Sequence, residues 1–164
     1  MLELLFPFFL LVLFFLSLFI IWRINARKYI SSGTVASAYD AWTEDKLLER
    51  LWGEHIHLGF YPPGKENIDF RKAKVQFVHE LVKWSGLDKL PKGSRILDVG
   101  CGIGGSSRIL AEYYGFNVTG ITISPAQVKR ARELTRHGLN CNFQVMDALE
   151  LQFEDGSFDA IWSV

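Results

Sequence analysis

The chain has 164 residues, of which 49% are hydrophobic and 14% aromatic, with 18 Lys and Arg balanced by 18 Asp and Glu. The zero net charge excludes a basic surface for nucleic-acid phosphates and an acidic solvating tail, and the hydrophobic content excludes a disordered chain. Two cysteines, Cys101 and Cys141, are too few for a disulfide scaffold and lack metal-site spacing, so we expect no metal centre.

An uncharged apolar segment of nineteen residues, Leu4 to Trp22, opens the chain. At a rise of ~1.5 Å per residue it would reach roughly 28 Å, close to the ~30 Å hydrocarbon thickness of a bilayer. We therefore predict one transmembrane helix within residues 1–24; a cleaved signal peptide is the alternative. Basic residues follow the segment, as Arg23, Arg27 and Lys28, and none precedes it, which predicts that the rest of the chain faces the cytoplasm with reduced thiols.

The next part of the chain reads as a linker followed by helices. Residues 25–40 are small and polar, which predicts a linker. Thr43 is the expected N-cap of a helix that runs to about residue 52, and a loop follows over residues 53–64. A second helix begins after Asp69 and ends at Gly86, with an apolar stripe at helical spacing formed by Phe70, Ala73, Phe77, Leu81 and Trp84. Residues 41–92 thus form a helical N-terminal region.

From residue 93 onward the pattern changes to alternating strands and helices. Strands are expected at residues 96–99, 117–123, 140–146 and 158–164, and helices at 106–114 and 125–137, the second opened by Ser124 as cap. This order predicts an α/β fold with a Rossmann-like, doubly wound parallel sheet over residues 93–164. Four strands leave such a sheet incomplete at Val164, so we expect the chain to be the N-terminal part of a longer protein, or a truncated product.

A glycine-rich turn joins the first strand to the helix after it. It fits two patterns, Gly100-x-Gly102-x-x-Gly105 and Asp98-x-Gly100-x-Gly102-x-Gly104. Glycines let a ligand approach the backbone, and a helix N-terminus offers unpaired amides. The sequence therefore predicts a nucleotide or nucleoside cofactor at this turn.

The acidic residues favour a cationic cofactor over a dinucleotide. A dinucleotide site usually has an acidic residue at the end of the second strand, where this chain has Thr122. Carboxylates stand instead at Asp98, Asp147 and Asp159. A carboxylate beside the glycines would repel a pyrophosphate and attract a cationic group.

Residues 96–105 (ILDVGCGIGG) resemble the first motif of class I S-adenosylmethionine-dependent methyltransferases. Four segments carry a narrower resemblance: WGEHIHLGFY (52–61), LDVGCGIGGSSRILA (97–111), GITISPAQVKRA (120–131) and DGSFDAIWSV (155–164). Together the four are similar to the tocopherol-pathway methyltransferases of cyanobacteria and plants.

The resemblance implies a cofactor, a reaction and a set of binding residues. The cofactor would be S-adenosyl-L-methionine, and the acceptor a ring carbon of a lipophilic prenylated hydroquinone, 2-methyl-6-phytyl-1,4-hydroquinone. The alternatives are a tocopherol or sterol acceptor, or a truncated membrane protein without activity. The implied location is a cyanobacterial-type membrane, or a plastid membrane with the domain facing the stroma. The cofactor residues would be Asp98, Gly100, Gly102, Gly104, Thr122, Asp147 and Ala148.

One cluster of titratable side chains lies in an otherwise aromatic segment. Glu54, His55 and His57 are candidates for a general base or a substrate-orienting group, because removing a phenolic proton makes the neighbouring ring carbon more nucleophilic. The alternative is an ordinary surface loop. We expect Cys101 to contribute only small size within the glycine turn.

Overall fold

The computed structural model describes the backbone of residues 2–26 and 32–164, and the side chains of residues 10–23 and 35–164. It contains two compact units, residues 1–38 and residues 39–164. The second unit carries every predicted site residue.

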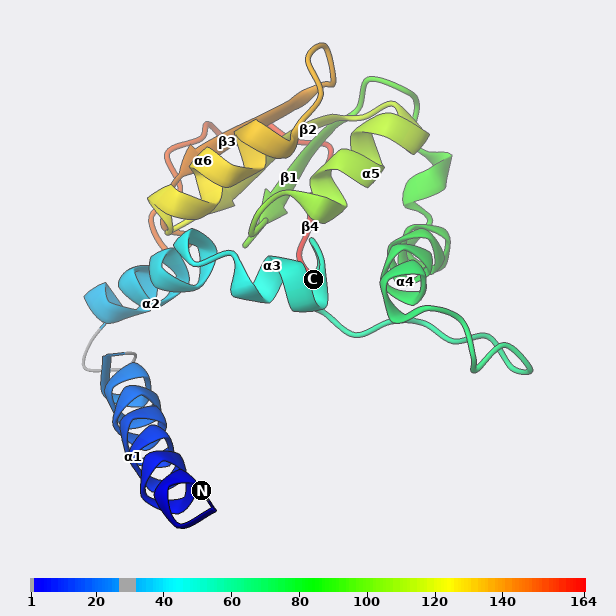
Figure 1. The fold of residues 1–164 in the computed structure, drawn as a ribbon. Helices are drawn as coiled ribbons and strands as arrows, with labels where there is room; N and C mark the ends of the chain where they lie inside the picture. Colours follow the sequence, from blue (N-terminus) through cyan, green and yellow to red (C-terminus); the bar gives the residue numbers. More distant parts are fainter. Residues whose placement is uncertain (1, 27–31) are drawn as a thin grey trace. The chain divides into compact units, whose positions relative to one another are not determined.

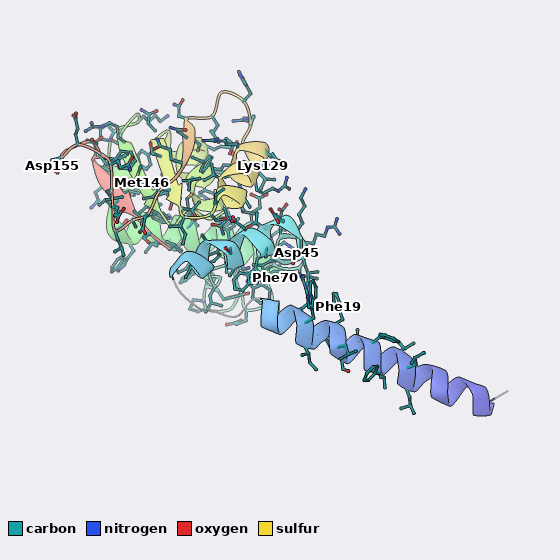
Figure 2. All side chains as sticks on the ribbon, turned by 90° about the vertical axis from the view of Figure 1, so that its left-hand side faces the viewer. Phe19, Asp45, Phe70, Lys129, Met146 and Asp155 are labelled. Carbon is teal, nitrogen blue, oxygen red and sulfur yellow. The ribbon has the colours of Figure 1, made fainter. Side chains whose placement is uncertain are left out.

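Helix α1 (Leu2–Ala26) forms the apolar segment of the first unit. The large apolar side chains of residues 10–22 are 44–62% exposed, and Figure 2 shows them, Phe19 included, projecting on all sides of the helix. Within the part of the chain that the structure describes, no helix combines the length and hydropathy needed to cross a membrane. The predicted anchor over residues 1–24 extends beyond the described side chains of this helix.

Helices α2 (Ser32–Glu44) and α3 (Leu47–Trp52) correct the prediction for the segment after it. The predicted linker over 25–40 is wrong from residue 32 onward, because the small and apolar residues there form a helix. Within it the ring centres of Tyr39 and Trp42 lie 5.6 Å apart. Residues 27–31 lie outside the described part. Thr43 is not a cap either, since its hydroxyl donates within α2 to the Tyr39 carbonyl at 2.8 Å. The Asp45 carboxylate accepts from the Leu47 amide at 2.9 Å, and the N-cap residue of α3, Lys46, makes no side-chain cap hydrogen bond.

Helix α4 (Phe70–Ser85) has the predicted ends and a different buried face. The Asp69 side chain accepts from the first amides of the helix, and Gly86 takes the left-handed conformation just past its end, as predicted. Burial, however, runs along Ala73, Val78 and Val82, whereas Trp84 is 84% exposed. The prediction that Trp84 belongs to the buried stripe is therefore wrong. A short 3-10 turn, η1 (Leu87–Lys89), leads into the sheet.

The sheet confirms the predicted Rossmann-like architecture. Its strands are β1 (Arg95–Val99), β2 (Asn117–Thr122), β3 (Cys141–Val145) and β4 (Ala160–Trp162). All pairs are parallel and the order is β3-β2-β1-β4. Helices α5 (Gly105–Tyr114) and α6 (Pro125–Leu134) connect β1 to β2 and β2 to β3 and cover the same face of the sheet (Figure 1). Helix α6 ends three residues before the predicted His137.

The strand order fixes where a ligand can bind. The direction of chain progression reverses between β1 and β4, and ligands of open parallel sheets bind outside the carboxyl ends of the strands at such a point. Apolar residues of β1, β2, α4 and α5 form the main core of the domain. The glycine turn leaves the sheet at the carboxyl end of β1.

Candidate functional site at the carboxyl ends of the strands

A cavity of about 530 Å³ lies at the carboxyl ends of β1 and β2. Its walls come from the glycine turn, the end of β2, the segment after β3, helix α2 and the loop after α3. Residues far apart in the sequence thus converge on the place where the sheet topology predicts a ligand site.

The base of the cavity combines a buried carboxylate with open glycine backbone. Asp98 is 2% exposed, accepts a hydrogen bond from the Ser107 hydroxyl at 2.5 Å and lines the cavity. Burial raises its pKa from 3.8 to about 6, although the Ser107 hydrogen bond works in the opposite direction. Gly100 and Gly102 have φ of +75° and +54°, and a Cβ added at either would meet no atom within 4 Å. Their main chain is therefore free to contact a ligand, in a conformation that other residues rarely adopt.

A polar network forms the wall at the end of β2. The Thr122 hydroxyl donates to the Gln127 side-chain oxygen at 2.7 Å, and both residues line the cavity. The Asp40 carboxylate of α2 accepts from the Ser124 hydroxyl at 2.5 Å and from the Ala126 amide at 3.0 Å. Asp40 thereby links the end of α2 to the start of α6, and residues 39–43 of α2 contribute to one side of the cavity.

The loop after α3 brings the three candidate catalytic residues to the same cavity. Glu54, His55 and His57 all line it. Nε2 of His57 lies 3.1 Å from Nδ1 of His55, and Nδ1 of His57 lies 2.8 Å from the Leu58 carbonyl oxygen. Burial lowers the pKa of both rings, that of His55 to about 4, with nearby positive charge adding to the effect. Both rings are neutral at physiological pH as a result.

Two cations hold this loop against the rest of the domain. Lys74 of α4 is 3% exposed, and its ammonium donates to the carbonyls of Trp52 at 2.9 Å and His55 at 2.7 Å. The same ammonium lies 4.5 Å from the centre of a Trp52 ring, a cation–π distance. Arg108 of α5 pairs with the Glu54 carboxylate and donates to the Ile103 carbonyl at 2.8 Å, which ties the loop to the glycine turn.

The loop also depends on close contact with the start of α5. A Cβ at Gly105 would lie 2.8 Å from the Glu54 carbonyl oxygen and 2.8 Å from Cε1 of His55. Gly105 has no positive φ in this structure, so its role is to let the loop approach the helix rather than to permit an unusual backbone.

Most of the predicted cofactor residues line the cavity, and two do not. Asp98, Gly100, Gly102, Thr122 and Ala148 line it. Gly104 lies against the core instead, where a Cβ would be 2.6 Å from the Phe143 ring. The Asp147 carboxylate accepts the Leu149 amide at 2.9 Å, while its neighbours Met146 and Ala148 reach the cavity.

The two cysteines are free thiols with no sign of activation. Burial is the main cause that raises the pKa of both, that of Cys141 to about 12, and the carboxylate of Asp98 adds to the effect. Cys101 therefore stays protonated inside the glycine turn.

Sequence reasoning missed five contributors to the site. Gln127 lines the cavity, and Lys74 and Arg108 hold the loop that carries His55. Tyr39 and Trp42 stand three residues apart, a helical spacing within the supposed linker that could have indicated a helix face; both line the cavity.

Known proteins share both the sequence and the fold of this region. Residues 96–164 match the family model described as a methyltransferase domain. Residues 96–164 therefore form a methyltransferase domain. It is 60% identical to the 2-methyl-6-phytyl-1,4-hydroquinone methyltransferase of Synechocystis sp. over 88% of this chain and 45% of that protein. It is 41% identical to the chloroplastic tocopherol O-methyltransferase of Arabidopsis thaliana over 72% of this chain and 37% of that protein.

A solved structure agrees with the fold of the methyltransferase domain. A candidate sarcosine dimethylglycine methyltransferase from Galdieria sulphuraria superposes with a TM-score of 0.66 and 31% identity, over 76% of this chain and 48% of that chain. The present chain thus spans somewhat less than half the length of the curated relatives described above.

Proposed function

We propose that this chain belongs to an enzyme that transfers a methyl group from S-adenosyl-L-methionine to a ring carbon of a prenylated hydroquinone, 2-methyl-6-phytyl-1,4-hydroquinone. The observation that carries the proposal is the cavity between the glycine turn that follows Asp98 and the loop after α3. This loop, which carries Glu54, His55 and His57, is called the histidine loop below. The substrate class follows from the 60% identity to the methyltransferase of that hydroquinone.

The residues of the cavity fit S-adenosyl-L-methionine. A buried carboxylate at Asp98 suits a ligand with an ammonium group and a positive sulfur, and the open backbone at Gly100 and Gly102 suits its close approach. Thr122 and Gln127 offer polar atoms for ribose hydroxyls, and the backbone around Ala148 offers a wall for an adenine ring. When bound, the cofactor would supply a methyl group activated by the sulfonium.

The remaining chemistry is positioning and proton removal. The acceptor carbon must lie in line with the methyl group, and that alignment accounts for much of the rate of such reactions. His55 lines the cofactor cavity, and its neutral ring has a lone pair that can take the proton of the phenolic hydroxyl next to the reacting carbon. Replacement of His55 by Ala should lower turnover and leave cofactor affinity unchanged.

A tocopherol is the second candidate acceptor, supported by the 41% identity to a tocopherol O-methyltransferase. Both acceptors carry a phenolic hydroxyl and a long apolar tail. The phenol that His55 would deprotonate is common to the two reactions, so the cavity by itself does not favour one of them.

We further propose that the apolar segment 4–22 holds the enzyme at a membrane, with the methyltransferase domain on the cytoplasmic or stromal side. An uncharged run of this length and the basic residues that follow it support this arrangement. Each methylene of a lipid tail contributes ~0.8 kcal/mol to its partition into the bilayer, so an enzyme held there avoids moving the tail into water. Carbonate extraction of membranes tests the proposal; release of the chain into the supernatant would oppose it.

The test of the function is methyl transfer from labelled S-adenosyl-L-methionine by this chain in detergent or membranes. We expect label in the dimethylated hydroquinone. The Gly102→Val variant should give none, because valine rarely adopts the left-handed backbone conformation of residue 102 and its side chain would enter the cavity. Label in tocopherol alone would favour the second acceptor. A chain that neither transfers label nor binds S-adenosylhomocysteine would refute the proposal.

A further inference from the structure

His55 and His57 are in direct contact at the edge of the cofactor cavity. Their ring centres are 4.9 Å apart, and Nδ1 of His55 and Nε2 of His57 are separated by 3.1 Å, a hydrogen-bond distance. His57 also packs on Phe77 of α4, with ring centres 5.1 Å apart. Two neighbouring rings are therefore held in a fixed relation.

The Leu58 carbonyl determines which nitrogens carry protons. A carbonyl oxygen only accepts, so Nδ1 of His57, 2.8 Å away, must hold a proton. In a neutral ring the other nitrogen, Nε2, then has only a lone pair and must accept. The partner atom, Nδ1 of His55, must therefore donate, which leaves Nε2 of His55 without a proton.

The surroundings of the pair keep both rings neutral. His55 is faced by Lys74 of α4, Arg108 of α5 and Glu54 of its own loop, and the Glu54 carboxylate is itself paired with Arg108. Burial and the positive groups lower the pKa of both histidines. Among the residues that the structure describes, no group makes a hydrogen bond with Nε2 of His55.

We propose that His57 is a positioning residue that fixes the tautomer of His55 and thereby keeps Nε2 of His55 available to take the phenolic proton of the acceptor. The inference rests on the proposed function, in which His55 is the general base. It adds the reacting atom and the residue that selects it.

The proton balance is complete without a further reactant. The phenolic proton moves to Nε2 of His55, and the ring carbon beside the oxygen forms a bond to the methyl carbon while the carbon–sulfur bond breaks with its electron pair left on sulfur. The ring carbon then loses its hydrogen as a proton to water, and the phenolate oxygen recovers a proton from His55. The net products are the methylated hydroquinone, the thioether and one proton. Throughout, Nδ1 of His55 donates to His57, which stabilises the transient imidazolium.

Nitrogen-15 NMR of the full chain in detergent, labelled at histidine only, reads the tautomers without any need for activity. The four histidines are assigned from single variants. We expect His55 to carry its proton on Nδ1 in the wild-type chain, and to change to a mixture or to the Nε2 form in His57→Phe. In His57→Gln a side-chain oxygen replaces the accepting nitrogen, so the wild-type tautomer should return.

Turnover should follow the tautomer. We expect His57→Phe to lower kcat about tenfold or more with unchanged affinity for S-adenosylhomocysteine, and His57→Gln to restore most of it, since a general base contributes roughly 10²–10⁴ in rate. His79→Phe is the matched control, because His79 of α4 contacts the Tyr114 hydroxyl at 2.8 Å, outside the cavity lining.

The NMR result separates this inference from the proposed function. A wild-type His55 protonated on Nε2, or a His57→Phe variant with unaltered His55 tautomer, would overturn the inference even if methyl transfer is confirmed. Conversely, the expected tautomers in a chain that fails to methylate the hydroquinone would leave the positioning role intact and refute only the acceptor.

Discussion

Replacement of Asp98 by Asn should stabilise the folded chain while weakening cofactor binding. Burial raises the pKa of Asp98 from 3.8 to about 6 in the folded state, so the folded chain holds this proton more tightly than the unfolded chain does. Ionisation above pH 6 therefore costs folding free energy, and the cost disappears as the pH falls from about 6 to 4. At pH 8 the raised pKa of Asp98 lowers the free energy of unfolding by about 3 kcal/mol, because each pKa unit corresponds to about 1.4 kcal/mol.

Urea unfolding of the detergent-solubilised chain at pH 8 and pH 5 measures the first effect. We expect Asp98→Asn to unfold at higher urea than the wild type at pH 8, and the difference to shrink at pH 5. Calorimetric titration with S-adenosylhomocysteine measures the second effect. A loss of about tenfold or more is expected, since a charge-assisted hydrogen bond contributes ~1.5 kcal/mol or more.

Asp159 provides a control of opposite sign. Hydrogen bonds from Arg95 lower the pKa of this exposed carboxylate to about 2, so it stabilises the folded chain above the unfolded-state value and loses this effect as the pH falls through about 2. Asp159→Asn should therefore lower the unfolding midpoint at pH 8. The reasoning is refuted if Asp98→Asn is less stable than the wild type at pH 8, or if its stability difference does not change with pH.

Two further predictions concern the contacts of the histidine loop. Gly105→Ala should destabilise the chain by about 1–2 kcal/mol and lower turnover. The added Cβ would clash with the Glu54 carbonyl at an overpacking cost of ~1–3 kcal/mol, against a helix-propensity gain of at most ~1 kcal/mol. A variant that is more stable than the wild type in urea unfolding would contradict this prediction. Lys74→Met should cost about 3–6 kcal/mol, because the carbonyls of Trp52 and His55 each lose a charged donor and each such hydrogen bond contributes ~1.5–3 kcal/mol. An unfolding midpoint within experimental error of the wild type would show that water replaces the ammonium.

Local chemistry made much of the fold predictable. The Asp69 cap, the Ser124 cap and the Gly86 stop act within one turn of the helix that they begin or end, and all three are in place. The parallel sheet was also predictable. Short apolar strands separated by helices require crossover connections, and the right-handed preference of these connections leaves few possible sheet topologies. The glycine turn and Asp98 follow directly from β1, so their convergence on one cavity was also predictable.

The error at residues 32–40 has a different origin. Small residues such as Ser and Gly give the α2 segment a weak helix propensity. The positions of Tyr39 and Trp42 are explained only by the folded structure, in which both side chains line the cavity. Tertiary packing overrides weak propensity in such a segment.

By itself the sequence determined the sheet, its connections and the cofactor turn, because each depends on residues within a few positions of one another. The tertiary structure alone decided the rest. Lys74 is buried because two carbonyls about twenty residues earlier in the chain accept from its ammonium, and Gly105 is required because the His55 loop packs against its helix. Gly104 is required because the Phe143 ring packs against it, and it does not line the cavity. Local sequence rules do not predict such contacts, because they arise only when the folded chain has brought distant segments together.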